Sequence, residues 1–357
     1  TSAARFVSDE VSQVGAGIQD QQTFARALAV DPLRDTAGDE LLSGLHGKDV
    51  IVAFVESYGR VAVQDSVFST DVGTALDVGT DRLHAAGYSV QSAFLTSATF
   101  GGASWLAHST LQSGLWIDSQ QRYDRLVASN RSTLSEAFKR AGWRTVGDVP
   151  SNDQAWPQGT SFYHYDQIYD ARNVGYVGPR FSYASMPDQY ILSAFQRLEL
   201  AKPNRAPVMA EIDLVSSHTP WAPLPQMTDW SKVGDGSVFD TMPAQGQSPD
   251  VVWRDPSQVR TAYGQSIEYT LSTLISFVET YLDHNLVLVI LGDHQPATIV
   301  SGPNASHDVP ITIIAHDPSV MDRISGWGWQ DGMTPGSEAP VWPMDAFRHR
   351  FLTAFGP

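Results

Sequence analysis

The sequence predicts an α/β fold with a large, mainly parallel central sheet and helices on both of its faces. Mostly apolar segments of strand length occur at 49–56, 207–215 and 286–291, and the last of these is uninterrupted, a pattern typical of strands covered on both sides. Segments with helical spacing of apolar residues separate them, the longest at 257–282. This alternation of strands and helices indicates a mainly parallel sheet.

The remaining elements follow the same alternation. Further strands are expected at 89–94, 143–149 and 309–315. Further helices are expected at 70–86, 103–113, 131–141, 186–198 and 345–355. Residues 1–45 are polar and mostly helical in pattern, and we interpret them as a lead-in that packs on a main domain spanning residues 46–357.

Residues 223–256 are rich in Pro, Gly, Ser and Asp and show no periodicity. Such a long segment without its own pattern predicts a surface excursion, which could cover a site.

The composition excludes several classes of protein. The net charge of −16, from 23 basic and 39 acidic residues, argues against a nucleic-acid partner. The lack of cysteine excludes disulfides, thiolate metal sites and a cysteine nucleophile. No apolar run approaches 18 residues, so we expect neither a membrane span nor a signal peptide in this sequence. The start at Thr1 suggests a soluble piece of a longer protein.

Polar residues stand where the predicted strands meet one edge of the sheet. A parallel sheet gathers the carboxyl ends of its strands along that edge, where sites form in open α/β folds. Oxygen and imidazole ligands without sulfur suit Zn²⁺ or Mn²⁺, and Mg²⁺ less well. The residues concerned are Glu56, His218, Asp293, His294 and His307, with Ser104 after Gly101-Gly102 at a helix start. Because a metal ion activates a hydroxyl, Ser104 is the candidate nucleophile.

This arrangement resembles the alkaline phosphatase superfamily, in its sulfatase-like branch of lipoteichoic acid synthases (phosphoglycerol transferases) and phosphoethanolamine transferases. The resemblance covers roughly residues 48–315 and implies that Glu56, Ser104, Asp293 and His294 bind one catalytic metal. It implies that His218, in Ser216-Ser217-His218-Thr219-Pro220, contacts the substrate phosphate or a second metal, which His307 would join.

The resemblance also bears on the substrate. Residues 162–169 are similar to the segment that holds glycerol phosphate in lipoteichoic acid synthases, but Tyr163 and Tyr165 replace a Trp and an Arg of that family. His108, one turn after Ser104, is a further candidate for substrate binding.

Two alternatives concern the nucleophile and its support. The family nucleophile is usually Thr, so Thr99 is the alternative to Ser104. Asp213, expected to point inward from its strand, is a candidate for a residue that contacts and orients a metal ligand.

Sulfate-ester hydrolysis is disfavoured. Sulfatases carry Pro two residues and Arg four residues after the nucleophile, whereas here Ser104 is followed by Trp105-Leu106-Ala107-His108. The resemblance therefore implies a metal-dependent phosphoryl-ester hydrolase or phosphoglycerol-type transferase acting on a cell-envelope phosphate ester through a phosphorylated Ser104. It implies an extracytoplasmic domain that reaches the membrane only through a segment outside this chain. The alternative is a catalytically silent relative that binds an envelope glycan or lipid head group.

Overall fold

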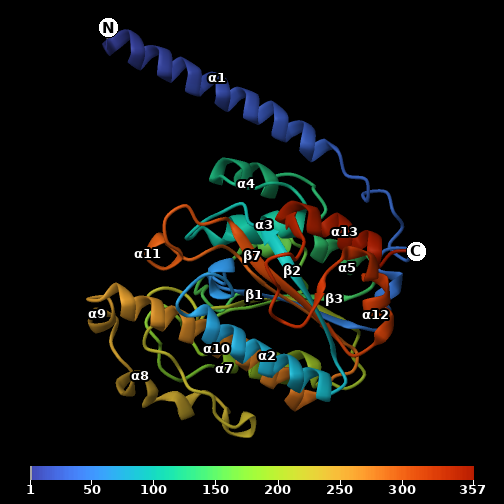
Figure 1. The fold of residues 1–357 in the computed structure, drawn as a ribbon. Helices are drawn as coiled ribbons and strands as arrows, with labels where there is room; N and C mark the ends of the chain where they lie inside the picture. Colours follow the sequence, from blue (N-terminus) through green and yellow to red (C-terminus); the bar gives the residue numbers. More distant parts are fainter. Residues whose placement is uncertain (1) are drawn as a thin grey trace.

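A nine-stranded mixed sheet forms the centre of the molecule in the computed structural model, which describes residues 2–357 (Figure 1). Its order is β4-β3-β5-β1-β6-β7-β2-β8, with β9 also paired to β2. The strands are β1 (Asp49–Val55), β2 (Ser89–Thr96), β3 (Arg144–Asp148), β4 (Gln167–Tyr169), β5 (Val208–Leu214), β6 (Leu286–Gly292), β7 (Asp308–Ala315), β8 (Gln330–Asp331) and β9 (Val341–Pro343). The predicted α/β fold with a mainly parallel sheet is confirmed.

Helices cover both faces of the sheet. The α-helices of the body are α2 (Ser69–Ala85), α3 (Ser104–Ser113), α4 (Gln120–Val127), α5 (Leu134–Arg140), α6 (Pro157–Ser161), α7 (Asp188–Phe195), α8 (Met242–Gln245), α9 (Pro249–Val252), α10 (Pro256–Tyr281), α11 (Thr298–Ser301), α12 (Pro318–Arg323) and α13 (Phe347–Ala354). Helices α2, α7 and α10 lie on one face and α3, α5, α12 and α13 on the other (Figure 1).

The central strand β1 shows why both faces are covered. Its residues alternate between two cores: Ile51, Ala53 and Val55 pack towards α2 and α10, and the residues between them pack towards α3 and α13. Strand side chains alternate between faces, so a wholly apolar strand requires a helix layer on each side.

Strand β7 runs antiparallel to its two neighbours, and its direction matters for the site. Strand β1 pairs in parallel with β5 and β6, whereas β7 is antiparallel to both β6 and β2. The start of β7 therefore lies at the edge where β1, β5 and β6 end. This orientation brings the residues before Asp308 to the edge that carries Glu56 and Asp293.

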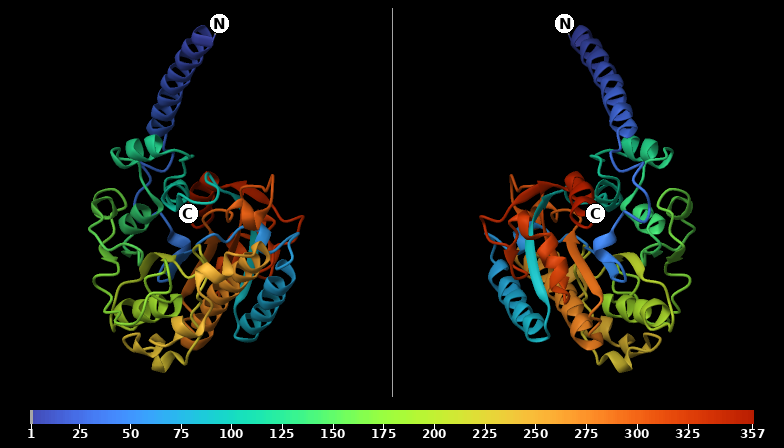
Figure 2. Two further views of the ribbon diagram at one scale, coloured as in Figure 1. Left: turned by 90° about the vertical axis from the view of Figure 1, so that its left-hand side faces the viewer. Right: turned by 90° about the vertical axis from the view of Figure 1, so that its right-hand side faces the viewer.

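Helix α1 (Ser2–Ala29) projects from the body over most of its length (Figures 1 and 2). Near its end, Phe24 is buried and Asp20 accepts hydrogen bonds from Arg122. The apolar side chains further up the helix, from Phe6 to Ile18, are exposed. Contacts between α1 and the body are thus found near the C-terminal end of the helix. Within the described residues, no helix is both long and apolar enough to span a membrane.

Residues 223–256 hold only short helical turns, among them α8 and α9. Trp253 stacks on Trp221, with 5.9 Å between ring centroids, and its indole N–H donates to the carbonyl of Pro220. The segment therefore supports the loop that follows β5.

Candidate metal and nucleophile site

Strands β1 and β6 are parallel neighbours, and the candidate ligands follow their last residues. Val55 is paired with Gly292, so Glu56 and Asp293 leave the sheet side by side. A Cβ on Gly292 would lie 1.8 Å from the carbonyl oxygen of Tyr58, so only glycine allows the loop after β1 to approach so closely. The two carboxylates come together because of this backbone contact.

Asp293 is fixed by the backbone through one of its oxygens. Its Oδ1 accepts hydrogen bonds from the N–H groups of Ser57 and His294, each at 2.8 Å. Its Oδ2 is buried and has no hydrogen-bond partner. An ionisable oxygen left in that state indicates a missing partner, and a cation is the natural one.

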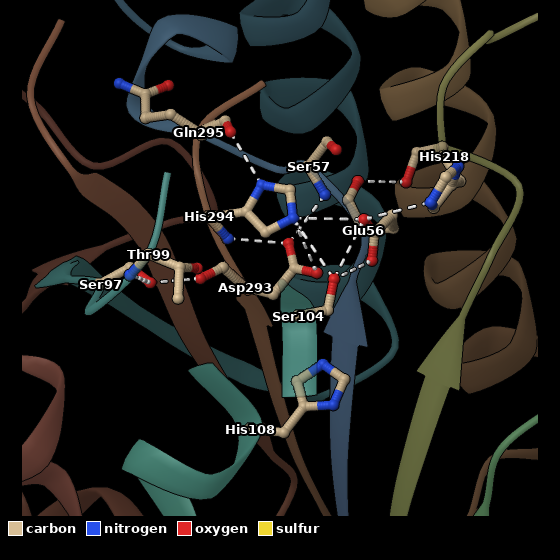
Figure 3. A network of polar contacts seen from close by, with 12 residues as sticks. Glu56, Ser57, Ser97, Thr99, Ser104, His108, His218, Asp293, His294 and Gln295 are labelled. Atoms are coloured by element: carbon tan, nitrogen blue, oxygen red, sulfur yellow. Dashed lines mark hydrogen bonds and ion pairs between the residues drawn. The ribbon is translucent and has the colours of Figure 1, made fainter. Parts of the chain in front are cut away.

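Ser104 begins α3 directly after Ala103, whose φ of 59° is unusual for a residue with a Cβ. The Ser104 hydroxyl lies 3.0 Å from Oε2 and 3.2 Å from Oε1 of Glu56, and 3.3 Å from Nε2 of His294 (Figure 3). The predicted nucleophile thus lies among the predicted ligands. The strained residue before it is consistent with a functional position.

The distances among these groups match a tetrahedral metal site. His294 Nε2 lies 3.3 Å from Glu56 Oε1 and 3.5 Å from Asp293 Oδ2. Ligands about 2.0–2.1 Å from a tetrahedral ion lie about 3.3–3.4 Å from one another. Glu56, Asp293 and His294 form a group that could hold an ion. The described structure therefore brings together four residues that the sequence placed in one metal site.

The orientation of His294 also suits a metal ligand. Its Nδ1 lies 2.8 Å from the carbonyl oxygen of Gln295. A carbonyl only accepts hydrogen bonds, so Nδ1 carries a proton, and Nε2, which faces the group around Glu56, is the atom that would bind a metal.

Burial and mutual charge shift the pKa values of these ligands. Burial and the charge of Glu56 raise the pKa of Asp293 to about 7. Burial alone would lower the pKa of His294, but Asp293 and Glu56 outweigh it and raise that pKa to about 9. Burial opposes ionisation of Glu56, yet hydrogen bonds from Asp293, His294 and Ser104 leave its pKa below the usual value. The group therefore holds protons that a metal ion would displace.

His218 borders the group from the loop after β5. Its Nε2 lies 3.9 Å from Glu56 Oε1 (Figure 3). Its ring stacks on Tyr183 with 3.5 Å between centroids. Its Nδ1 donates to the carbonyl of Thr219 at 2.6 Å, so Nε2 faces the site. Burial lowers the pKa of His218, which favours the neutral ring. Ser217 holds this loop to β1 by donating to the carbonyl of Glu56.

Two other candidates lie apart from the group. His307 is exposed, and its ring lies against Phe100 with 5.3 Å between centroids. It is not part of the Glu56 group in the described residues, although the reversed direction of β7 brings it to the correct edge. Thr99 is buried beside Ser97, and its hydroxyl has no partner.

A cavity of about 600 Å³ opens over Ser104. Tyr163 and His108 line it, as does His218. Tyr165 lies behind the wall, where its hydroxyl accepts a hydrogen bond from Gln112. The other aromatic side chains of the cavity wall are Phe54, Trp105, Tyr123, Trp156, Tyr183 and Trp221.

Sequence reasoning overlooked one residue of the cavity floor. Glu211 is buried there beside Asp213 and His108. Burial raises the pKa of Glu211 to about 7, and burial together with Glu211 raises that of Asp213 well above its usual range. Burial lowers the pKa of His108 to about 4. Two carboxylates at alternate positions of an otherwise apolar strand were the available signal.

No protein-family model matches the sequence, and no curated protein matches it. Solved structures do resemble it. A Vibrio parahaemolyticus protein of the alkaline phosphatase superfamily matches with a TM-score of 0.57 and 15% identity, over 94% of this chain and 75% of its own. The periplasmic domain of Escherichia coli EptC, in complex with Zn, matches with a TM-score of 0.55 and 12% identity, over 87% and 83%.

Streptococcus pyogenes phosphoglycerol transferase GacH, in complex with sn-glycerol-1-phosphate, matches over 96% of this chain and 91% of its own, with a TM-score of 0.51 and 13% identity. At such identities these neighbours establish the fold. The fold expected from the resemblance, that of the alkaline phosphatase superfamily and its sulfatase-like branch, is confirmed.

Proposed function

We propose that this chain, which has the alkaline phosphatase fold, is a metal-dependent phosphoryl-ester hydrolase or phosphoglycerol-type transferase that uses Ser104 as its nucleophile. The observation that carries the proposal is the position of the Ser104 hydroxyl, 3.0–3.3 Å from Glu56 and His294 at the floor of an open cavity. A hydroxyl among metal ligands and facing a cavity is suited to in-line attack on phosphorus.

Glu56, Asp293 and His294 are proposed to hold the ion, with Ser104 as a fourth ligand. The buried, unpartnered Oδ2 of Asp293 and the Nε2 of His294, which faces Glu56 and Asp293, fit that role. Zn²⁺ and Mn²⁺ accept this mixture of oxygen and nitrogen donors. When bound, such an ion would lower the pKa of the serine hydroxyl and offset negative charge near the phosphoryl group.

The reaction is proposed to proceed by double displacement. Ser104 Oγ forms a bond to phosphorus as the bond to the leaving alcohol breaks, and water or an acceptor hydroxyl then releases the phosphoryl group from the serine. His218 presents an unprotonated Nε2 to the site, because its Nδ1 donates to Thr219 and its pKa is lowered. It is therefore placed to accept the proton of the incoming hydroxyl.

Neighbouring structures support the substrate class and the location. The GacH structure contains sn-glycerol-1-phosphate, and EptC is described as a periplasmic domain. A cell-envelope phosphate ester and an extracytoplasmic location are proposed for this chain on that basis. Tyr163 in the cavity wall is proposed to contact the substrate.

The test is turnover of p-nitrophenyl phosphate and its phosphodiester analogue by the metal-loaded protein. Turnover should require Zn²⁺ or Mn²⁺, and Ser104→Ala should lower it by at least about 10³-fold. Ser151→Ala, which alters another serine of the cavity wall, is the matched control and should retain activity. Peptide mapping of a stalled reaction should find the phosphoryl group on Ser104. Absence of turnover in the metal-loaded parent would favour the silent, ligand-binding alternative.

A further inference from the structure

A second group of ligand-type side chains lies in the floor of the same cavity. His108, Glu211 and Asp213 each present one donor atom, and these atoms all lie within 4.8 Å of one another. Nδ1 of His108 lies 3.4 Å from Oδ2 of Asp213, close to the separations found around Glu56. All three residues line the cavity together with Ser104.

The fold places this group directly beside the first. Glu211 and Asp213 alternate along β5 and so point to the same face of the sheet. Asp213 is paired with Phe54 of β1, two residues before Glu56. His108 follows Ser104 by one turn of α3 (Figure 3). Its ring packs on Phe54 with 4.1 Å between centroids.

Two atoms of the group have no hydrogen-bond partner although they are buried: Nε2 of His108 and Oδ1 of Asp213. Glu211, by contrast, is held in place, because Gln112 donates to its Oε1 at 3.3 Å. The amide of Gln112 is itself oriented, since its oxygen accepts from the backbone N–H of Ser135. An oriented carboxylate beside unpartnered donor atoms is typical of a site that awaits a ligand.

The charge in this part of the cavity is unbalanced. The lining of the cavity, within the described residues, contains neither lysine nor arginine. His108 is neutral at pH 7, because burial lowers its pKa. No basic side chain is therefore present to balance ionised Glu211 and Asp213 beside an anionic substrate. A proton shared by the two carboxylates would remove one charge but would leave His108 Nε2 and Asp213 Oδ1 unpartnered.

We propose that His108, Glu211 and Asp213 form a second divalent-cation site in the cavity floor. The mixture of one imidazole and two carboxylates favours Zn²⁺ or Mn²⁺ over Ca²⁺. A cation there would give the acidic floor the positive charge that a phosphate ester needs. This purpose rests on the function proposed above, but binding of the ion can be measured without any substrate.

The first test counts bound ions. The chain, freed of metal with a chelator and dialysed, is titrated with Zn²⁺ or Mn²⁺ by calorimetry, and the metal retained after gel filtration is measured by elemental analysis. The parent should retain two equivalents. Asp213→Asn and Glu211→Gln should each retain one equivalent, because they lose the ion of the second site. Asp293→Asn should also retain one, because it loses the ion held with Glu56 and His294. Asp250→Asn, an exposed carboxylate outside the cavity, is the matched control and should retain two. A parent that saturates at one equivalent, or an Asp213→Asn variant that retains two, overturns the proposal.

The second test uses thermal stability and covers the case in which one variant folds poorly. In chelator, Glu211→Gln and Asp213→Asn should melt at or above the temperature of the parent, because each removes a buried carboxyl group whose ionised form is costly to bury. With saturating metal the parent should melt above both variants, because it alone fills the second site. His108→Gln provides a third variant and should also lose one equivalent of metal. If metal raises the melting temperatures of the variants and of the parent by the same amount, the proposal fails.

The two proposals fail in different ways. A chain that binds two ions but turns over no phosphate ester would refute the proposed function and leave the second site standing. A chain that turns over the ester with a single bound ion, and whose turnover is not reduced by Asp213→Asn, would refute the second site alone.

Discussion

Raising the pH from 7 to 9 in the presence of a chelator is expected to destabilise the folded protein through one residue, His294. The pKa of this imidazole is about 9 in the folded chain and 6.5 for an ordinary histidine. A raised pKa means that its stabilising contribution is complete below pH 6.5 and is lost as the pH rises through 9. Between pH 7 and 9 the folded chain keeps a proton that the unfolded chain has released.

The magnitude follows from the same values. With pKa values of about 9 and 6.5, the free energy of unfolding falls by about 2 kcal/mol between pH 7 and pH 9, because the folded chain has itself released half of this proton at pH 9. The assay is urea unfolding in EDTA at pH 7, 8 and 9, followed by tryptophan fluorescence. His294→Gln is the control, because glutamine fills a similar place without titrating.

The parent should lose about 2 kcal/mol more than His294→Gln over this range. Bound metal should weaken or reverse the trend, because a metal-bound imidazole carries no proton on Nε2 and metal affinity rises with pH. Equal losses in the parent and in His294→Gln would refute the placement of this imidazole between Glu56 and Asp293.

Three further outcomes are expected. Thr99→Ala should leave turnover within about twofold of the parent, since Ser104 and not Thr99 contacts Glu56; a loss comparable to that of Ser104→Ala would reverse this assignment. Asp49→Ala should lower the free energy of unfolding by about 3 kcal/mol, measured in urea, because it removes both hydrogen bonds that Arg205 donates to this buried carboxylate. Deletion of residues 1–18 should change neither the melting temperature nor the turnover, because most of that part of α1 is exposed; a melting temperature lowered by several degrees would show that it packs on the body.

The central strands could be predicted because their signal is local. A run such as Asp49–Val55 has no polar residue after its first, and only a strand covered on both faces can bury it. The short strands β4, β8 and β9 carry no such signal, because two or three residues show no periodicity. The direction of β7 could not be read either, since a buried strand has the same composition whether its neighbours run parallel or antiparallel.

The site also contains residues that could be predicted from the sequence and contacts that could not. Glu56, Asp293 and His294 could be predicted because each directly follows an apolar strand, and the parallel pairing of β1 and β6 then fixes their proximity. The contacts in the floor of the cavity could not be predicted, because Asp213 contacts His108 only through the packing of α3 on the sheet. The contact between the backbone of Ser57 and Asp293, 236 residues later, likewise has no trace in the local sequence.

That separation along the chain has a consequence for biosynthesis. Glu56 and Ser104 are synthesised early. Asp293 and His294, which complete the candidate site, follow β6 and are synthesised only after the long helix α10. A nascent or truncated polypeptide that stops before Gly292 therefore contains the proposed nucleophile but not Asp293 and His294. Under the proposed function, such a chain would lack reactivity towards phosphate esters until β6 has joined the sheet beside β1.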